Sequence, residues 1–281
     1  MTPVMECDAE ASIEALPAEA RLDTFFRSVA GAYTSVLLVD FDGTLAPFRV
    51  DPAKVRPWAG VTRLLEGIQA SGRTRLALVS GRPARDVARQ LGMPQTPEVW
   101  GLHGAERLWP DGHMDVEVLP EGQIHALHAA RVAVRESGVV EQLGLRVEEK
   151  GNAVVVHWRG KTAGIAHVAR DRMVAVLQPF AKSDALEMML FDGGVEVRCG
   201  RDKGDAVRLV LEEMDANAPV AYPVAYLGDD VTDEHAFEAL GQRGLSILVR
   251  RVWRPTAAHM WLRPPAQLKE FLSRWLAAVE G

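Results

Sequence analysis

The sequence predicts an α/β protein whose main domain is a doubly wound parallel sheet, interrupted by an inserted α+β domain. Two observations predict the sheet: the chain contains four short apolar runs, and helical patterns separate or follow them. A third observation predicts the insertion, because the middle of the chain shows a strand that alternates apolar and polar residues. The 281 residues are enough for about two domains.

The four apolar runs are expected to be buried strands with helices covering both faces of the sheet. They span residues 36–39, 76–79, 224–227 and 245–249. The helical patterns span about 57–70, 83–91, 203–213, 233–240 and 265–279. Since these segments come from both ends of the chain, we expect both ends to build one sheet.

The middle of the chain predicts a smaller α+β domain with one covered sheet face. Its helices are expected over about 121–138 and 163–180, and two of its strands over 145–149 and 153–158. We expect an acidic extension at residues 1–25. The α/β core is expected in two pieces, 26–108 and 196–281, and the inserted α+β domain at 109–195.

Composition excludes several classes of protein. A net charge of −6 with 6% aromatic residues argues against nucleic-acid binding. No apolar run approaches the roughly 18–20 residues that cross a membrane, and the first 20 residues carry five acidic side chains, unlike a signal peptide. The two cysteines, Cys7 and Cys199, are too few for a disulfide framework. We therefore expect a cytoplasmic protein that binds neither nucleic acid nor membrane.

The first apolar run ends in two carboxylates, in the sequence DFDGTL at residues 40–45. Residues two apart in an extended segment face the same way, so Asp40 and Asp42 are expected to point into one site while Phe41 turns to the core. Gly43 permits a turn there. Aspartate is also a common turn former, so this motif alone does not establish a catalytic site.

A second group of acids follows the run at 224–227, in the sequence GDDVTD at residues 228–233. Carboxylate oxygens of this kind suit a hard ion such as Mg²⁺. Helix capping by Thr232 or Asp233 is the alternative explanation, but it does not account for Asp229 and Asp230 at the strand end. The sequence therefore predicts a magnesium site at this edge of the sheet.

Two further motifs predict a phosphate site. Ser80 follows an apolar run and precedes a helix, so its hydroxyl and the nearby amides can receive phosphate oxygens. Lys203 opens another helix, where the helix dipole disfavours a cation unless an anion lies nearby. A solvated surface lysine is the alternative. The glycine-rich phosphate loops of nucleotide-binding proteins are absent from the sequence.

In this order, the four motifs resemble those of the haloacid dehalogenase superfamily of phosphohydrolases. A more specific resemblance, over about residues 35–275, is to the trehalose-phosphatase family. The segments that carry it are residues 40–47, 79–82, 101–106 and 228–237, with 148–151 and 157–159 in the inserted domain. Generic members of the superfamily share the acids but not the sequence HGAE at residues 103–106.

The resemblance implies a Mg²⁺-dependent phosphatase that hydrolyses trehalose 6-phosphate through an aspartyl-phosphate. Asp40 would attack the phosphorus, and Asp42 would act as general acid and then general base. Thr44 and Ser80 would hold phosphoryl oxygens, and Lys203 would offset their charge.

The resemblance also implies the ligands of the metal. The magnesium ion would lie between Asp40, the backbone carbonyl of Asp42, and Asp229. Asp230 and Asp233 would support that set of ligands.

By the same resemblance the inserted domain is a cap that closes over the sheet and excludes water. Glu148, Lys150 and Glu196 match residues that bind the distal glucose in the family. Weaker candidates near the hinge are Arg82, His103, Gly104 and Arg198. A cross-strand charge pair on an exposed strand is the alternative explanation of Glu148 and Lys150, and a structural role is the alternative for His103.

The sequence departs from the family pattern at two places, and it is also compatible with two other functions. Cys199 stands where proline is common, and residues 259–261 lack a common tyrosine. A phosphatase of the same fold could act on sucrose phosphate or mannosylglycerate phosphate. A non-catalytic sugar-phosphate-binding domain is the other alternative, although all the catalytic acids are present. No feature marks a surface for contact with a trehalose-phosphate synthase.

Overall fold

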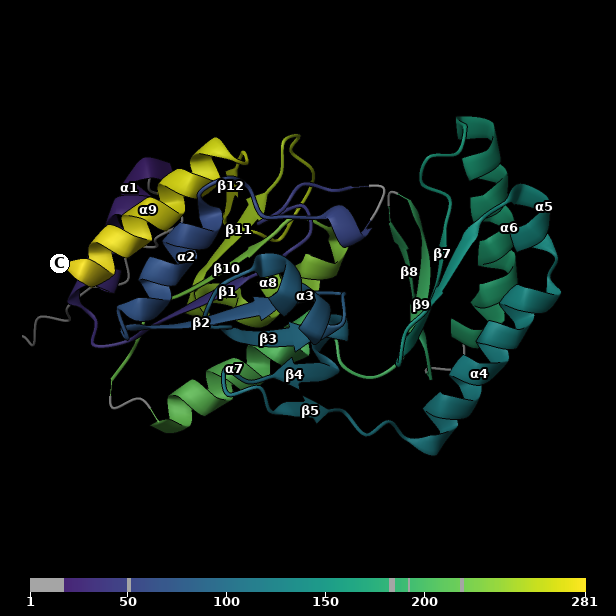
Figure 1. The fold of residues 1–281 in the computed structure, drawn as a ribbon, viewed down its shortest axis with the longest axis horizontal. Coiled ribbons are helices and arrows are strands. Elements are labelled where there is room, and N and C mark those ends of the chain that lie inside the picture. The colour runs from purple at the N-terminus through teal and green to yellow at the C-terminus, as the bar shows by residue number, and fades with distance from the viewer. Residues whose placement is uncertain (1–17, 50–51, 182–184, 192, 218–219) are drawn as a thin grey trace, which may run out of the picture.

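The computed structural model describes residues 18–49, 52–181, 185–191, 193–217 and 220–281. An eight-stranded sheet with helices on both faces lies beside a four-stranded antiparallel sheet with helices on one face (Figure 1). Of the expected acidic extension, residues 1–17 lie outside the described residues. The rest belongs to helix α1 (Ala18–Gly31), where Leu22 and Phe25 pack against the core.

The large sheet is mostly parallel. Its strands lie in the order β12 (Met260–Leu262), β11 (Leu245–Val249), β10 (Val224–Gly228), β1 (Ser35–Val39), β2 (Thr74–Val79), β3 (Glu98–Gly101), β4 (Glu106–Leu108) and β5 (Met114–Val116). The first six are parallel to one another, whereas β4 is antiparallel to β3 and β5 is antiparallel to β4. The predicted parallel sheet is thus confirmed, with an antiparallel edge that the sequence did not indicate.

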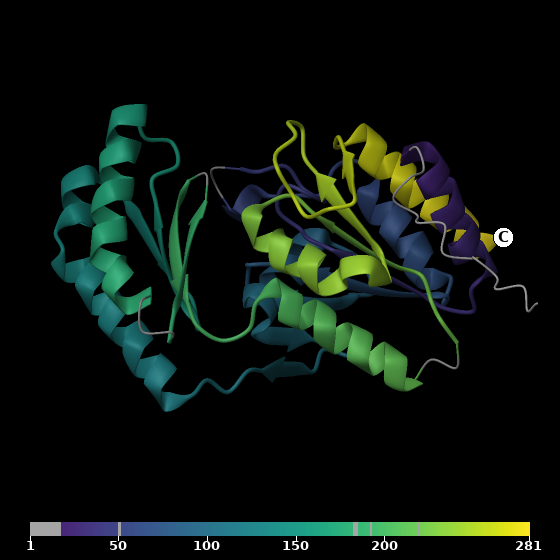
Figure 2. The ribbon, with the colours of Figure 1, turned by 180° about the vertical axis from the view of Figure 1, so that it is seen from behind.

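Successive residues of β1 enter two different hydrophobic cores. Leu37 and Val39 pack on the face covered by α1, α2 (Val61–Ala70), α3 (Ala84–Leu91) and α9 (Ala266–Glu280). Val36 and Leu38 pack on the other face, with α7 (Lys203–Asn217) and α8 (Glu234–Leu240), which lie in front of the sheet in Figure 2. Burial on both faces explains why the strand is apolar at every position.

The small sheet has one apolar and one polar face. Its order is β6 (Arg146–Glu149), β7 (Ala153–His157), β9 (Gly194–Arg198) and β8 (Glu187–Phe191), all antiparallel. Residues such as Val154 and Val195 pack on α4 (Glu121–Glu136), α5 (Val139–Leu143) and α6 (Ala163–Ala181). The opposite face, which carries Glu196, is turned toward the large sheet (Figure 1).

Short 3-10 helices complete the described elements. They are η2 (Pro52–Lys54), η3 (Leu102–Gly104), η4 (Val231–Asp233) and η5 (Gly241–Arg243). Helix η3 directly follows β3, and two residues separate η4 from the end of β10. No helix in the described part of the chain has the length and apolar character needed to cross a bilayer.

Candidate active site

Asp40 and Lys203 form a buried ion pair at the end of β1. Lys203, the first residue of α7, donates hydrogen bonds to Oδ1 of Asp40 at 2.7 Å and to Oδ1 of Asp233 at 2.8 Å. Burial raises the pKa of Asp40 to about 8, although Lys203 opposes this shift. Burial would lower the pKa of Lys203, but the two carboxylates outweigh it and raise that pKa. The lysine is therefore a fixed positive charge beside Asp40.

Asp233 organises the loop that follows β10. Its Oδ1 accepts hydrogen bonds from Lys203 and from the hydroxyl of Tyr226 at 2.7 Å. Its Oδ2 accepts from the backbone N–H groups of Asp229 and Asp230, both at 3.0 Å. A Cβ on Gly228 would lie 2.3 Å from Cγ of Asp233, so glycine is needed at that position.

Three carboxylates fit a divalent cation. Asp40, Asp229 and Asp233 each offer an oxygen, and these oxygens lie within 4.8 Å of one another. Oδ2 of Asp40 and Oδ1 of Asp229 are buried and have no hydrogen-bond partner among the described residues. Burial and the neighbouring carboxylates raise the pKa of Asp229 well above its usual value. A hard cation would satisfy both oxygens and offset the excess of negative charge.

Two other acids that were predicted at the metal make different contacts with their carboxylates. Arg82 donates two hydrogen bonds to the carboxylate of Asp42, from Nε to Oδ2 and from Nη2 to Oδ1. Oδ1 of Asp230 accepts from the backbone N–H of Val231 at 2.8 Å, and Asp230 and Asp233 form a capping box for η4. The capping expected near Thr232 therefore involves Asp230 as the N-cap residue.

The predicted phosphate-binding hydroxyls lie buried at the ends of β1 and β2. Thr44 Oγ1 has no hydrogen-bond partner in the described structure, whereas Ser80 Oγ accepts from the backbone N–H of Arg82 at 3.2 Å. Between Asp42 and Thr44 the chain turns at Gly43, whose φ is +86°. A Cβ there would lie 2.1 Å from Oδ2 of Asp229. The loop can approach the metal cluster this closely because residue 43 is glycine.

Glu196 links the polar face of the small sheet to the large sheet. Lys150 Nζ donates to its Oε1 at 3.1 Å, and His103 Nε2 lies 3.3 Å from its Oε2. Burial opposes ionisation of Glu196, but His103 and Lys150 together hold its pKa well below the usual value. Burial lowers the pKa of His103 to about 4. His103 has a φ of 60°, and a Cβ on Gly81 would lie 2.7 Å from its ring.

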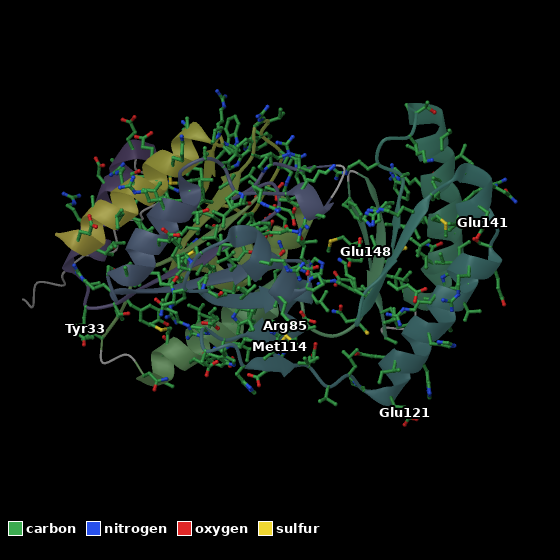
Figure 3. All side chains as sticks on the ribbon, viewed as in Figure 1. Tyr33, Arg85, Met114, Glu121, Glu141 and Glu148 are labelled. Atoms are coloured by element: carbon green, nitrogen blue, oxygen red, sulfur yellow. The ribbon has the colours of Figure 1, made fainter. Side chains whose placement is uncertain are left out.

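Glu148 lies on the same polar face, on the side turned toward the large sheet (Figure 3). Its Oε2 is 2.9 Å from Nε2 of His157 and accepts from Nη1 of Arg146 at 3.2 Å. The hydrogen bond with His157 is the main cause that lowers the pKa of Glu148 to about 2. Sequence analysis missed His157 as a site residue. Its cross-strand position opposite Arg146 is the signal that could have indicated it.

The two remaining candidates are Arg198 at the end of β9 and Gly104 in η3. Arg198 is buried and donates from Nη2 to Oε2 of Glu187 at 2.5 Å, so the structure gives it a partner within the small sheet. Gly104 has a φ of +111°, and a Cβ there would lie 2.9 Å from the carbonyl oxygen of Asp202. Asn152 was not predicted, although its Nδ2 donates to the carbonyls of Leu102 and Cys199, both at 3.2 Å.

Comparison with known proteins identifies the family. Residues 38–263 match the trehalose-phosphatase family model. The chain belongs to the trehalose-phosphatase family. The resemblance seen in the sequence motifs is thereby confirmed.

Mycobacterial proteins are among the curated relatives of this trehalose-phosphatase family member. The chain is 34% identical over 247 residues to a trehalose-phosphate phosphatase of Mycobacterium marinum, covering 84% of this chain and 60% of that protein. It is 35% identical over 267 residues to one of Mycobacterium avium, covering 90% and 64%. The chain thus spans about 60% of the length of the curated relatives it matches.

Solved structures confirm the fold. A trehalose-6-phosphate phosphatase related protein superposes with a TM-score of 0.64 at 26% identity, covering 88% of this chain and 97% of that one. The C-terminal domain of Candida albicans trehalose-6-phosphate phosphatase gives 0.73 at 19% identity, covering 92% and 96%. A haloacid dehalogenase-like hydrolase from Bacteroides thetaiotaomicron gives 0.55 at 17% identity, covering 88% and 98%. The predicted haloacid dehalogenase-like fold is therefore confirmed.

Proposed function

We propose that this protein is a Mg²⁺-dependent phosphatase that hydrolyses trehalose 6-phosphate to trehalose and inorganic phosphate. The observation that carries the proposal is the buried Asp40, held by Lys203 at one oxygen and unpartnered at the other, in a cluster with Asp229 and Asp233. Membership of the trehalose-phosphatase family supports the substrate.

The first half of the proposed reaction transfers the phosphoryl group to Asp40. A carboxylate oxygen of Asp40 forms a bond to phosphorus while the bond from phosphorus to the sugar oxygen breaks. Asp42 starts this half-reaction protonated, with one oxygen released from Arg82, and donates that proton to the departing oxygen. Thr44 and Ser80 donate hydrogen bonds to the phosphoryl oxygens. Lys203 stays protonated throughout and offsets negative charge beside Asp40.

The second half returns the enzyme to its starting state. Asp42 removes a proton from a water molecule, which attacks phosphorus and releases Asp40 as a carboxylate together with inorganic phosphate. When bound by Asp40, the Asp42 carbonyl and Asp229, Mg²⁺ supplies charge neutralisation and orientation of the phosphoryl group. Asp233 holds that arrangement through its bonds to the backbone N–H groups of Asp229 and Asp230.

We further propose that residues 109–195 act as a cap over a core made of 26–108 and 196–281. Apart from the phosphate, the two glucose rings present neutral hydroxyl groups, which need donors and acceptors in fixed positions. Glu148, Lys150 and Glu196 supply them on the face turned toward the large sheet. The contacts of Lys150 with Glu196 and of Glu148 with His157 fix the geometry before the substrate binds, which lowers the entropic cost of binding.

The test is phosphate release from trehalose 6-phosphate, sucrose 6-phosphate, glucose 6-phosphate and p-nitrophenyl phosphate, with Mg²⁺ or with EDTA. Activity on trehalose 6-phosphate should exceed the others, require Mg²⁺ and be abolished by Asp40→Asn. Preference for another sugar phosphate would retain the mechanism and reject the substrate. Folded protein without activity on any ester would favour a non-catalytic sugar-phosphate-binding domain.

The location belongs to the same proposal. We propose the cytoplasm, supported by Cys199, a buried free thiol in the described part of the chain. The other cysteine, Cys7, lies outside the described residues. Contact with a trehalose-phosphate synthase is compatible with the sequence and is not part of this proposal.

A further inference from the structure

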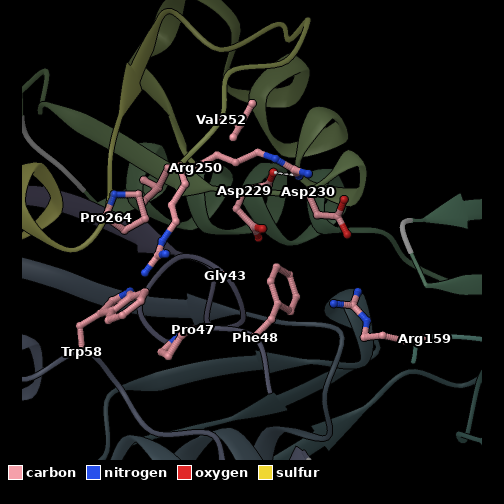
Figure 4. A pocket seen from close by; sticks show the side chains of 12 residues that line it. Gly43, Pro47, Phe48, Trp58, Arg159, Asp229, Asp230, Arg250, Val252 and Pro264 are labelled. Carbon is pink, nitrogen blue, oxygen red and sulfur yellow. Dashed lines mark hydrogen bonds between the residues drawn. The ribbon is translucent and has the colours of Figure 1, made fainter. Parts of the chain in front are cut away.

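A pocket of about 420 Å³ opens beside the carboxylate cluster of Asp40, Asp229 and Asp233. It lies between the loops that follow β1, β7 and β11 (Figure 4). Phe48 and Trp58 form aromatic walls, and Arg159, Arg250 and Arg251 bring three guanidinium groups to it. The nucleophile, the phosphate-binding hydroxyls, Lys203 and the proposed sugar-binding residues do not line it. It adjoins the site described above without containing its reacting groups.

Two of the three guanidinium groups lie over aromatic rings. The guanidinium carbon of Arg159 lies 5.0 Å from the ring centre of Phe48, and that of Arg251 lies 5.8 Å from that of Trp58. Both arginines are exposed, and neither has a carboxylate partner among the described residues. An arginine placed in this way keeps its N–H groups available for an incoming anion.

The charges around the pocket favour an anion. Arg250 donates from Nη1 to the carbonyl oxygen of Asp229 at 3.3 Å, which places it at the pocket wall. Against the three arginines stand Asp229 and Asp230. One oxygen of Asp230 is taken by the backbone N–H of Val231, and Asp229 belongs to the cation cluster. A divalent cation there would make the surroundings of the pocket more positive still.

The shape and the walls restrict the size of the ligand. A volume of about 420 Å³ lies within the range of small-molecule sites, about 300–1,000 Å³. The flat rings of Phe48 and Trp58 suit the apolar faces of a sugar ring, and arginine suits phosphate through paired N–H groups. The lining therefore fits inorganic phosphate or a sugar monophosphate.

We propose that this pocket is a second anion site, separate from the phosphoryl site at Asp40, which binds a small phosphate-bearing molecule between Arg159 and Arg251. Arg159 follows β7 of the small sheet, and Arg251 follows β11 of the large sheet. A ligand that contacts both arginines would therefore link the two sheets. The sequence motif that contains Arg159 thereby gains a role that the proposed hydrolysis does not use. The proposal rests on the proposed function in one respect: the proposed substrate, trehalose 6-phosphate, and one product, inorganic phosphate, both carry a phosphate group that this site could bind.

Binding without turnover tests the proposal. Inorganic phosphate and glucose 6-phosphate are titrated calorimetrically, in Mg²⁺, into the full chain and into Arg251→Ala and Arg159→Ala. Each substitution should weaken one binding event about tenfold and leave the event at Asp40 unchanged. Arg170→Ala is the matched control, because Arg170 is an exposed arginine of α6 that does not line the pocket.

The outcomes separate this proposal from the proposed function. Equal weakening for inorganic phosphate and glucose 6-phosphate would identify phosphate alone as the ligand, and tighter binding of glucose 6-phosphate would assign a contribution to the sugar. Isotherms unchanged by both arginine substitutions would overturn the second site, as would equal weakening in Arg170→Ala. Because the readout is binding, neither result depends on whether the protein hydrolyses trehalose 6-phosphate.

Discussion

Arg82 holds the carboxylate of Asp42 through two parallel hydrogen bonds, with Nη2 2.6 Å from Oδ1. The sequence predicted Arg82 as a substrate-binding residue and Asp42 as the general acid and base. Their contact links the two roles, because the planar guanidinium fixes the plane of the carboxylate. A bound substrate therefore meets an Asp42 whose orientation is set by a residue of the loop after β2.

Replacing Arg82 by lysine should lower kcat for trehalose 6-phosphate by about 10- to 100-fold. A lysine supplies the charge but not the paired N–H groups, so Asp42 loses its fixed orientation. Steady-state kinetics measures the change, and KM should rise less than kcat falls. Arg85→Ala removes an exposed arginine three residues away and serves as the control. A rise confined to KM would assign Arg82 to substrate binding alone.

Removing Lys203 should destabilise the metal-free protein strongly. Lys203→Met leaves the buried carboxylates of Asp40 and Asp233 without their cation, at a cost of about 3–5 kcal/mol. Urea unfolding in EDTA measures the free energy of unfolding. Lys161→Met, at an exposed position, should change it by less than about 0.5 kcal/mol. Similar values for both variants would show that Lys203 does not compensate the carboxylates.

The buried His103 should make the protein less stable in acid. Its pKa falls from 6.5 in the unfolded chain to about 4 in the folded protein, so between these values the unfolded state binds the extra proton. Stability is therefore complete above about pH 6.5 and falls as the pH drops. From pH 6.5 to 4.5 the loss should be about 2–3 kcal/mol.

Urea unfolding across this pH range measures the effect of His103. His103→Asn should flatten the dependence, because asparagine also tolerates the positive φ of residue 103 but does not titrate. An equally steep dependence in His103→Asn would assign the acid sensitivity to other groups.

Two glycines with nearly the same positive φ should respond differently to alanine. Gly43 and Gly60 have φ values of +86° and +87°, but a Cβ meets Asp229 at Gly43 and nothing within 4 Å at Gly60. Both substitutions should cost about 1–2 kcal/mol of backbone strain. Only Gly43→Ala should weaken Mg²⁺ binding, by at least about tenfold, since the carboxylate of Asp229 must move. Thermal unfolding against Mg²⁺ concentration compares them, and equal Mg²⁺ responses would contradict this role for Asp229.

The contact between Lys150 and Glu196 should matter for the sugar and not for the chemistry. Lys150→Met should raise KM for trehalose 6-phosphate about tenfold and leave turnover of p-nitrophenyl phosphate unchanged, because in the proposed binding mode only the disaccharide would reach Lys150 and Glu196 on the small sheet. The same assay with Lys161→Met is the control. A parallel loss on both substrates would place Lys150 at the phosphoryl site instead.

The strands of the large sheet were predictable because burial on both faces demands apolar residues without interruption. The observed β1, β10 and β11 differ from the predicted runs by at most one residue at either end. Short elements carry too few residues for a pattern to show. Helix α5 has five residues and β12 has three, and neither was predicted.

The candidate site was predictable to the extent that topology decides it. Strand ends of a parallel sheet meet at one edge, so Asp40 and Asp229 had to lie close together. The contacts that refine the site depend on side-chain orientation between distant segments. Tyr226 illustrates this: its place in an apolar run indicated a core residue, yet its hydroxyl bonds Asp233. No spacing rule reveals that bond, or the one between Arg82 and Asp42.

The strand order has a consequence for synthesis on the ribosome. β1 lies between β2 and β10, and Lys203 contacts Asp40 across 163 positions of sequence. When Asp40 has left the ribosome, neither β10 nor Lys203 has yet been translated. The small sheet and its helices, which are contiguous in sequence, can fold while the growing chain waits for β10. A truncated chain that stops before residue 203 thus contains Asp40 but not the lysine beside it.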